Sequence, residues 1–263
     1  QPLQEKATVA LVVTNSNNGE ILFESNPHTY LLPASTMKIL TALAAQGVLA
    51  PRSPFQTNMH VYGTQEHQTL HGTILIDGGG DPNLTSKDLD SFIQDLQDQQ
   101  IRRIDGNILV KSNHFDNRIH TPGTVWEEVN DCYAAPTSSL TLDNNCFTVT
   151  LHQENQRIIV DNPNLAQPIN NRIHLQNTCP HPEAPSTHHS ISSNIGVVDH
   201  DPFSMPQKLT GCWANQQGPV ELKLSMNNPA HHFTEQLQKK LQQANITLSG
   251  NIQHHNHPPI QQP

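Results

Sequence analysis

Residues 32–45 read LPASTMKILTALAA, and this stretch decides the fold. Most of its residues favour helix, Pro33 suits the first position of a helix, and Gly47 lies just past the expected end. Apolar side chains occur nearly all round the predicted helix over 34–45, so we expect it to be buried in the middle of a domain. A lysine at the start of a buried helix is unusual, which makes Lys38 the first candidate for a functional residue.

Outward from this helix, short strands and turns occupy both flanks. Residues 7–14 and 20–24 are rich in apolar residues and are separated by a turn, which predicts a hairpin. The further predicted elements are strands at 73–76, 107–110, 146–151, 157–160 and 220–226, a helix over 86–99 with Ser86 as its cap, and a helix that begins at Pro229 after the cap Asn228. This order predicts an α/β domain made from both chain ends and interrupted by a β-rich insertion.

The composition excludes two classes of partner or location. The 263 residues include 14 Lys and Arg against 23 Asp and Glu, for a net charge of −9, and no basic cluster offers a face for a phosphate backbone. Nucleic acid is therefore not an expected partner. No stretch approaches the roughly 18 apolar residues that a transmembrane helix needs. The clear apolar runs nevertheless indicate a folded chain of one large domain or two smaller ones.

The four cysteines are Cys132, Cys146, Cys179 and Cys212, and their spacings are too wide for paired C-x-x-C metal knuckles. Their even number favours disulfides and therefore an oxidising compartment, and the alternative is four buried free thiols. The chain begins at Gln1 rather than at Met, as a processed or trimmed chain does. We therefore expect an exported protein.

Ser35 and Lys38 form an S-x-x-K pattern at the start of the predicted helix. A serine hydroxyl is a poor nucleophile near neutral pH and needs a base. Residues three apart share a helix face, so Lys38 can lie beside the hydroxyl, and burial would lower the pKa of its amine toward the working range. The pattern indicates acyl transfer through a covalent intermediate. The alternative interpretation is a capping serine followed by a surface lysine.

The segment 32–44 closely resembles the active-site helix of the penicillin-binding protein 4 family, the S13 D-Ala-D-Ala carboxypeptidase/endopeptidases. The resemblance continues in order through 79–84 (GGDPNL), 104–107 (IDGN), 130–136 (NDCYAAP), 143–147 (DNNCF), 209–212 (LTGC) and 244–250 (ANITLSG). It implies a periplasmic or otherwise exported serine-type carboxypeptidase that acts on peptidoglycan stem peptides through an acyl-enzyme at Ser35. It also implies β-lactam antibiotics as acylating ligands and no cofactor.

The same resemblance implies a fold and a disulfide pattern. The fold class is α/β (α+β), with a partial β-lactamase/DD-peptidase-like domain formed by residues 1–55 and 219–263. A large β-rich inserted domain is expected over 56–218. The implied pairs are Cys132 with Cys146 and Cys179 with Cys212.

Asp131 and Tyr133 align with the place where the inserted domain of the family offers an acid and an aromatic ring to the substrate. An acid there would suit the free amino group of a diaminopimelate side chain. The alternative is that Asp131 is a turn residue and that Tyr133 packs against a disulfide.

The sequence departs from the family in its second and third catalytic motifs, S-x-N and K-T/S-G. Residues 192–194 (SSN) and 208–211 (KLTG) look similar but lie between Cys179 and Cys212, whereas the family motifs follow the segment equivalent to 246–250. We interpret both matches as accidental, since short motifs count only in the right structural context. The chain is then a fragment of a longer enzyme, a naturally shortened relative, or a protein completed by dimerisation.

Two hypotheses of function follow. The first is a serine D-Ala-D-Ala peptidase, and the second is a non-catalytic relative that binds cell-wall peptide or a partner. A metal site is not expected, although the chain has 17 histidines with adjacent pairs such as 188–189 and 231–232, because these lack the ordered spacing of zinc ligands. The glycine-rich run 77–81 lacks the final glutamate of a calcium loop and is predicted to be a tight turn.

Overall fold

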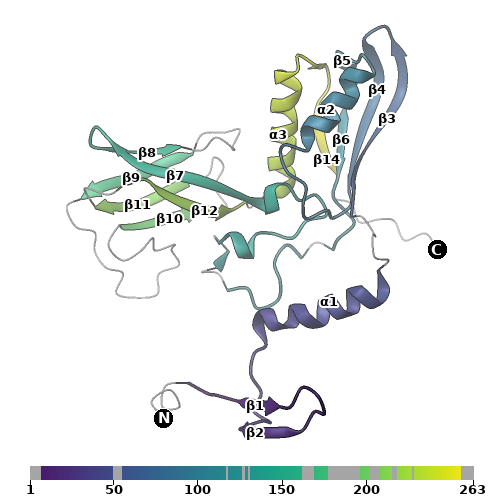
Figure 1. The fold of residues 1–263 in the computed structure, drawn as a ribbon. Coiled ribbons are helices and arrows are strands. Elements are labelled where there is room, and N and C mark those ends of the chain that lie inside the picture. Colours follow the sequence, from purple (N-terminus) through teal and green to yellow (C-terminus); the bar gives the residue numbers. More distant parts are fainter. Residues whose placement is uncertain are drawn as a thin grey trace. The chain divides into compact units, whose positions relative to one another are not determined.

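The structure is a computed structural model, and it describes residues 7–49, 55–116, 118–125, 128–129, 131–161, 169–176, 196–201, 208–214, 218–226 and 228–255. The chain divides into two compact units, Gln1–Ser53 and Pro54–Pro263. Figure 1 shows the elements of both units, which are described separately.

The first unit contains the predicted hairpin and helix. Strands β1 (Leu11–Thr14) and β2 (Ile21–Ser25) pair antiparallel, as their apolar pattern predicts. A single 3₁₀ turn, η1 (Ala34–Thr36), leads into helix α1 (Met37–Val48). The helix therefore begins about one turn later than expected and continues through Gly47.

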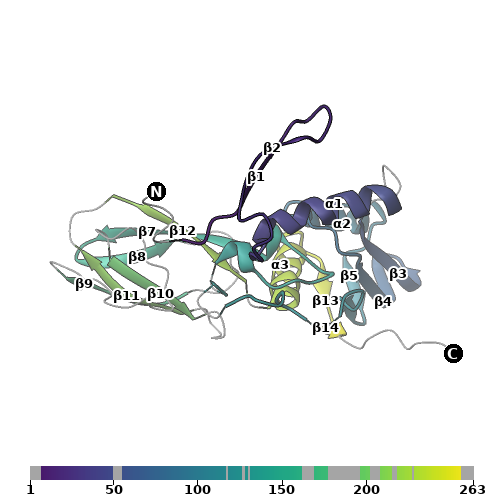
Figure 2. The same cartoon turned by 90° about the horizontal axis from the view of Figure 1, so that it is seen from below.

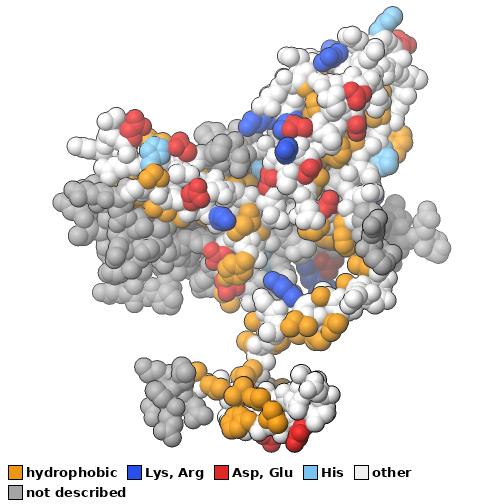
Figure 3. Space-filling model, in the orientation of Figure 1, with side chains coloured by type: hydrophobic (Ala, Val, Ile, Leu, Met, Phe, Trp, Pro, Cys, Tyr) orange, Lys and Arg blue, Asp and Glu red, His pale blue; other side chains and the backbone are white. Residues whose placement is uncertain are grey.

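The prediction that this helix is buried is wrong for the part of the chain that the structure describes. No residue of α1 is buried, and Ile39 and Leu43 are 63% and 59% exposed. Figure 3 shows hydrophobic side chains gathered over the hairpin and α1. The physical reason is that one two-stranded hairpin and one helix have too little surface to form a core of their own.

The second unit contains a sheet with two helices beside it (Figures 1 and 2). The strands are β3 (Thr57–Glu66), β4 (Thr69–Gly78), β5 (Arg103–Asp105), β6 (Ile108–Lys111), β13 (Thr247–Leu248) and β14 (Ile252–His255), and the helices are α2 (Leu89–Asp98) and α3 (Pro229–Gln243). The sheet order is β13-β5-β4-β6-β14, with β3 antiparallel to β4. Both helices bury one apolar face in the same core as β4 and β6.

A second core lies between two three-stranded sheets of the same unit. One sheet has the order β12-β7-β8, and the other has the order β10-β11-β9. The strands are β7 (Cys146–Glu154), β8 (Arg157–Asp161), β9 (Asn170–Gln176), β10 (Gly196–Asp201), β11 (Lys208–Ala214) and β12 (Val220–Ser225). Trp213 and Val149 are fully buried in this core.

The C-terminal elements share the core of the first sheet described in the second unit. The described part of residues 219–263 packs within the second unit. A domain that joins residues 219–263 to residues 1–55 stays a prediction. Phe233, Leu237 and Leu241 of α3 share a core with Ile74 of β4. The reason is that α3 presents its apolar stripe to the sheet, and β14 extends that sheet beside β6. The mixed α/β fold class is confirmed by the observed sheets and helices.

Two predicted caps have different outcomes. Asn228 caps α3 as expected, because its Oδ1 accepts a hydrogen bond of 3.0 Å from the backbone N–H of His231. Ser86 does not cap α2, since both its backbone N–H and its hydroxyl donate to the carboxylate of Asp143. None of the helices in the described ranges is both long and apolar enough to cross a membrane.

Candidate active site

Ser35 and Lys38 lie where η1 meets α1. The backbone N–H of Thr36 donates to the carbonyl of Pro33 over 3.0 Å, and the Thr36 hydroxyl donates to the same oxygen. This turn places Ser35 directly before the helix and Lys38 in its first turn. The two side chains are three residues apart, the spacing that aligns side chains on a 3₁₀ turn and on an α-helix.

The residue before Ser35 has a strained backbone. Ala34 has a φ of +45°, in the left-handed region that residues with a Cβ rarely adopt. This conformation costs about 1–2 kcal/mol for a residue other than glycine. Strain of this kind is often found beside functional groups, where the backbone has to present a particular atom. It therefore adds weight to Ser35 as the candidate nucleophile.

The structure does not bury this pair. Ser35 and Lys38 are both exposed, and neither side chain forms a hydrogen bond or an ion pair with the residues that the structure describes. The expectation of a water-shielded amine therefore fails for this part of the chain. The reason is the same as for α1 as a whole, since its apolar surface has no cover in its own unit.

Asp131 and Tyr133 lie on a short loop in the second unit. Asp131 precedes the 3₁₀ turn η3 (Cys132–Ala134), its backbone N–H donates to the carbonyl of Glu128 over 2.8 Å, and it forms a β-bridge with Leu224. Asp131 is half-buried, whereas Tyr133 is 73% exposed. Ser35 and Lys38 therefore belong to the first unit, and Asp131 and Tyr133 belong to the second.

Glu128 is a further acidic residue of this loop that the sequence analysis missed. Local desolvation, together with the adjacent carboxylates of Glu128 and Asp131, raises the pKa of Tyr133 to about 12. The phenol therefore keeps its proton at neutral pH, and the loop presents two carboxylates to a cation. The signal in the sequence was the pair of acids three residues apart, but only the folded turn brings both beside Tyr133.

A disulfide fixes this loop. Cys132 is bonded to Cys146 at the start of β7, with their Cα atoms 5.5 Å apart, as the family resemblance implies. Cys132 lies between Asp131 and Tyr133, so the bond holds both candidate residues at the end of a β-strand. Cys212 is also disulfide-bonded, and its expected partner Cys179 lies outside the described residues.

The two motif look-alikes differ in what the structure describes. Residues 208–211 lie on β11, the central strand of its sheet. Residues 192–194 lie outside the described ranges. Among the residues that the structure describes, no group of three or more His, Cys, Asp or Glu side chains could hold a metal ion.

Comparison with known proteins identifies the family. The family described as D-Ala-D-Ala carboxypeptidase 3 (S13) matches residues 1–263. D-alanyl-D-alanine carboxypeptidase DacB of Haemophilus influenzae is 28% identical over 256 residues, which cover 96% of this chain and 51% of that protein. A D-alanyl-D-alanine carboxypeptidase of Actinomadura sp. strain R39 is 29% identical over 141 residues, or 54% of this chain and 26% of that protein.

Solved structures agree with this assignment. The crystal structure of penicillin-binding protein 4 (dacB) from H. influenzae superposes with a TM-score of 0.79 at 25% identity, covering 94% of this chain and 53% of that one. A complex of the same protein with a β-lactam has a TM-score of 0.71 at 23% identity, which supports the fold. The chain spans about half the length of the DacB relative that it matches, at 51%. Because the family matches along all of its residues, the chain belongs to the D-Ala-D-Ala carboxypeptidase 3 (S13) family.

Proposed function

We propose that this protein acts as a serine-type D-Ala-D-Ala carboxypeptidase/endopeptidase on peptidoglycan stem peptides, with Ser35 as the nucleophile. The observation that carries the proposal is the family match over residues 1–263, with Ser35 and Lys38 at the start of α1. The left-handed Ala34 directly before Ser35 supports the same assignment.

The proposed chemistry uses the two residues in fixed roles. The neutral amine of Lys38 accepts the proton of the Ser35 hydroxyl while its oxygen attacks the carbonyl carbon of the D-Ala-D-Ala amide. The C–N bond breaks, the terminal D-alanine leaves with a proton on its nitrogen, and the peptide remains as an ester on Ser35. Water then attacks the ester and releases the shortened peptide. The exposed amine of Lys38 needs a covering surface for this role, because desolvation is what favours its neutral form.

Asp131, Glu128 and Tyr133 would bind the stem peptide. Two carboxylates beside a protonated phenol suit an ammonium group such as the free amine of a diaminopimelate side chain. The Cys132–Cys146 bond supports this role by fixing the loop, and it also favours an exported location such as the periplasm, because disulfides persist in oxidising compartments.

Intact-mass measurement after exposure to a β-lactam tests the proposed nucleophile. We expect the wild-type chain and the matched control Ser16→Ala, which changes an exposed serine of the β1–β2 turn, to gain the mass of one β-lactam. The Ser35→Ala variant should gain none. An adduct that persists in Ser35→Ala, or its absence from the wild type, would contradict the assignment of Ser35.

The exposure of Lys38 favours one second candidate, a non-catalytic relative that binds cell-wall peptide or a partner. In that case the wild type should bind a stem peptide without cleaving it or being acylated by a β-lactam. The Asp131→Ala variant should bind the peptide more weakly, whereas Asp116→Ala, at an exposed position outside the acidic loop, should bind normally. Peptide turnover by the wild type would rule out this candidate.

A further inference from the structure

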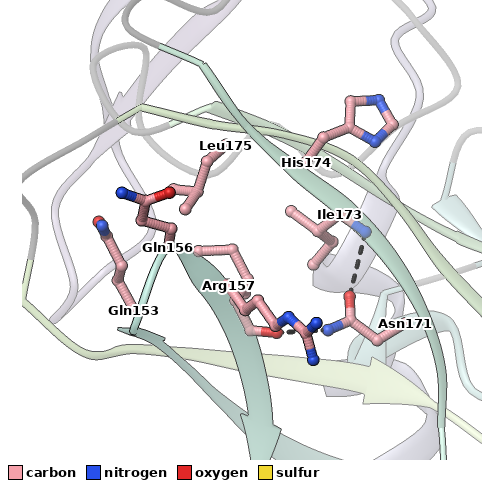
Figure 4. A pocket seen from close by; sticks show the side chains of 8 residues that line it. Gln153, Gln156, Arg157, Asn171, Ile173, His174 and Leu175 are labelled. Atoms are coloured by element: carbon pink, nitrogen blue, oxygen red, sulfur yellow. Dashed lines mark hydrogen bonds between the residues drawn. The ribbon is translucent and has the colours of Figure 1, made fainter.

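An open pocket of about 870 Å³ lies at the edges of the two sheets around the second core. Its walls come from the β7–β8 hairpin on one side and from β9 on the other (Figure 4). β8 and β9 are the edge strands of different sheets, and the side-chain amide of Asn171 joins them by donating 2.6 Å to the carbonyl of Ile158. The volume falls in the range of small-molecule sites, about 300–1,000 Å³.

The pocket has an apolar side and a polar rim. Ile158 is buried in the second core, and Ile173 and Leu175 are half-buried against it. The rim carries Gln153 and Gln156 on the hairpin and Arg157 at the start of β8. Figure 4 shows the two glutamines on one side of the pocket and Arg157 near Asn171 on the other. His174 also lines the pocket, but its ring extends away from these side chains, as the alternation along β9 requires.

The turn that presents the rim is strained. Asn155 and Gln156 are the two central residues of the hairpin turn between Glu154 and Arg157, and their φ angles are +46° and +64°. Two-residue turns with both φ angles positive strongly prefer glycine at the second position. Here that position holds a glutamine whose side chain lines the pocket. The presence of glutamine at a position where glycine is favoured indicates that its side-chain amide has a function.

Arg157 provides the charge of the pocket. Its guanidinium forms no ion pair with the residues that the structure describes, although Glu154 lies opposite it in the β7–β8 pairing. An unpaired guanidinium binds a carboxylate through two parallel hydrogen bonds. The two glutamine amides each offer donors and an acceptor, which suits hydroxyl and acetamido groups.

We propose that this pocket binds an N-acetylated saccharide with a free carboxylate, the chemistry of a glycan strand whose muramic acid residues carry no stem peptide. The carboxylate pairs with Arg157, the hydroxyl and acetamido groups bond to Gln153 and Gln156, and methyl groups rest against Ile173 and Leu175. The choice of glycan rests on the proposed action on peptidoglycan. The pocket lies wholly in the unit Pro54–Pro263, whereas Ser35 belongs to the unit Gln1–Ser53.

Calorimetric titration with two disaccharides tests the proposal. The first is N-acetylglucosaminyl-N-acetylmuramic acid without peptide, which carries the carboxylate, and the second is N,N′-diacetylchitobiose, which has none. We expect the wild type to bind the acidic disaccharide at least tenfold more tightly than the neutral one. Arg157→Gln should lose that preference, whereas Arg172→Gln, which changes an exposed arginine of β9 outside the pocket, should keep it.

A second variant separates recognition from folding. Gln156→Gly relieves the positive φ, so its urea-unfolding midpoint should be no lower than that of the wild type, while its affinity for the acidic disaccharide falls several-fold. Equal affinity of the wild type for both disaccharides, no binding of either, or unchanged binding by Arg157→Gln would overturn the proposal. β-Lactam acylation of Ser35, measured on Arg157→Gln, reports the proposed function independently. If none of the variants that still bind the disaccharide is acylated at Ser35, the peptidase function is refuted and the proposal for the pocket stands.

Discussion

Replacement of Asp143 by asparagine should destabilise the second unit in a pH-dependent way. Asp143 is the first of three consecutive left-handed residues, 143–145, with φ angles of +51°, +57° and +53°. Its carboxylate accepts hydrogen bonds from the backbone N–H of Ser86, over 2.9 Å, and from the Ser86 hydroxyl. The ring of His232 is almost fully buried with its Nε2 3.9 Å from Oδ2 of Asp143, too far for a hydrogen bond and close enough for an electrostatic contact. The carboxylate therefore links the loop before α2 to the first turn of α3.

The magnitude follows from the loss of the charged acceptor. Hydrogen bonds to a charged group are worth about 1.5–3 kcal/mol, against about 0.5–1.5 kcal/mol for neutral pairs. Asparagine tolerates the left-handed conformation and keeps one acceptor oxygen for the backbone N–H of Ser86. We therefore expect Asp143→Asn to lower the free energy of unfolding at pH 7 by about 1–2 kcal/mol.

The sign of the pH dependence follows from the pKa of Asp143. Burial acts to raise this pKa, but the interactions with His232 and Ser86 outweigh it and hold the pKa below its ordinary value of 3.8. A carboxyl whose pKa is lower in the folded state than in the unfolded state stabilises the fold. This stability is fully present above the pKa of the unfolded state and is lost as the pH falls through the pKa of the folded state. The difference between wild type and variant should therefore be constant from pH 7 to about 5 and shrink below about pH 4.

Urea unfolding at pH 7, 5, 4 and 3 provides the assay. With an m-value of about 2 kcal/mol/M, the midpoint should fall by about 0.5–1 M at pH 7. Asp116→Asn is the matched control, because its ion pair with Arg118 is exposed and should contribute less than about 1 kcal/mol. An equal difference between wild type and Asp143→Asn at every pH, or no difference at pH 7, would refute the role of the charged carboxylate.

Three further predictions concern the core, the disulfide and the acidic loop. Phe233→Ala should lower the free energy of unfolding by about 3–5 kcal/mol, since Phe233 is fully buried at 0% exposure, and a urea titration that shows less than about 1 kcal/mol would contradict this packing. Removal of the Cys132–Cys146 bond by a double alanine variant should cost about 3 kcal/mol for a loop of 14 residues, visible as a lower melting temperature in calorimetry, and an unchanged melting temperature would argue against it. Absorbance titration should show Tyr133 ionising near pH 12, in a step that Tyr133→Phe removes, and a step near pH 10 that disappears instead would show that the neighbouring carboxylates do not act on it.

Local patterns predicted the buried face of α2 and the start of α3. Within the predicted helix over 86–99, Leu89, Phe92, Ile93 and Leu96 recur at helical spacing, and all four side chains are buried in α2. Asn228 and Pro229 predicted the start of α3 in the same way. These predictions succeed because helix periodicity and capping depend on neighbours a few residues away. Strands β9 and β14 were missed, because their pairing partners β11 and β6 lie far along the chain. Strands β3, β5, β10 and β11 were missed as well.

The candidate site was only partly accessible from the sequence. Ser35 and Lys38 share a short motif, so their adjacency on one turn followed from helix geometry. The neighbourhood of Tyr133 did not, because Glu128 reaches it only through the folded loop. The pocket was equally hidden, since Gln156 and Asn171 line it from two different sheets.

The amino-acid order alone determined the family, the positions of its periodic helices and the S-x-x-K pair, because each of these is written in contiguous residues. The tertiary structure decided which partners these elements have. α3 packs on the sheet that contains β4 and β6, the backbone N–H of Ser86 donates to Asp143, and α1 lies exposed within its unit. The physical reason is that periodicity shows which face of an element is apolar, whereas burial depends on which other surface, distant in the chain, comes to cover that face.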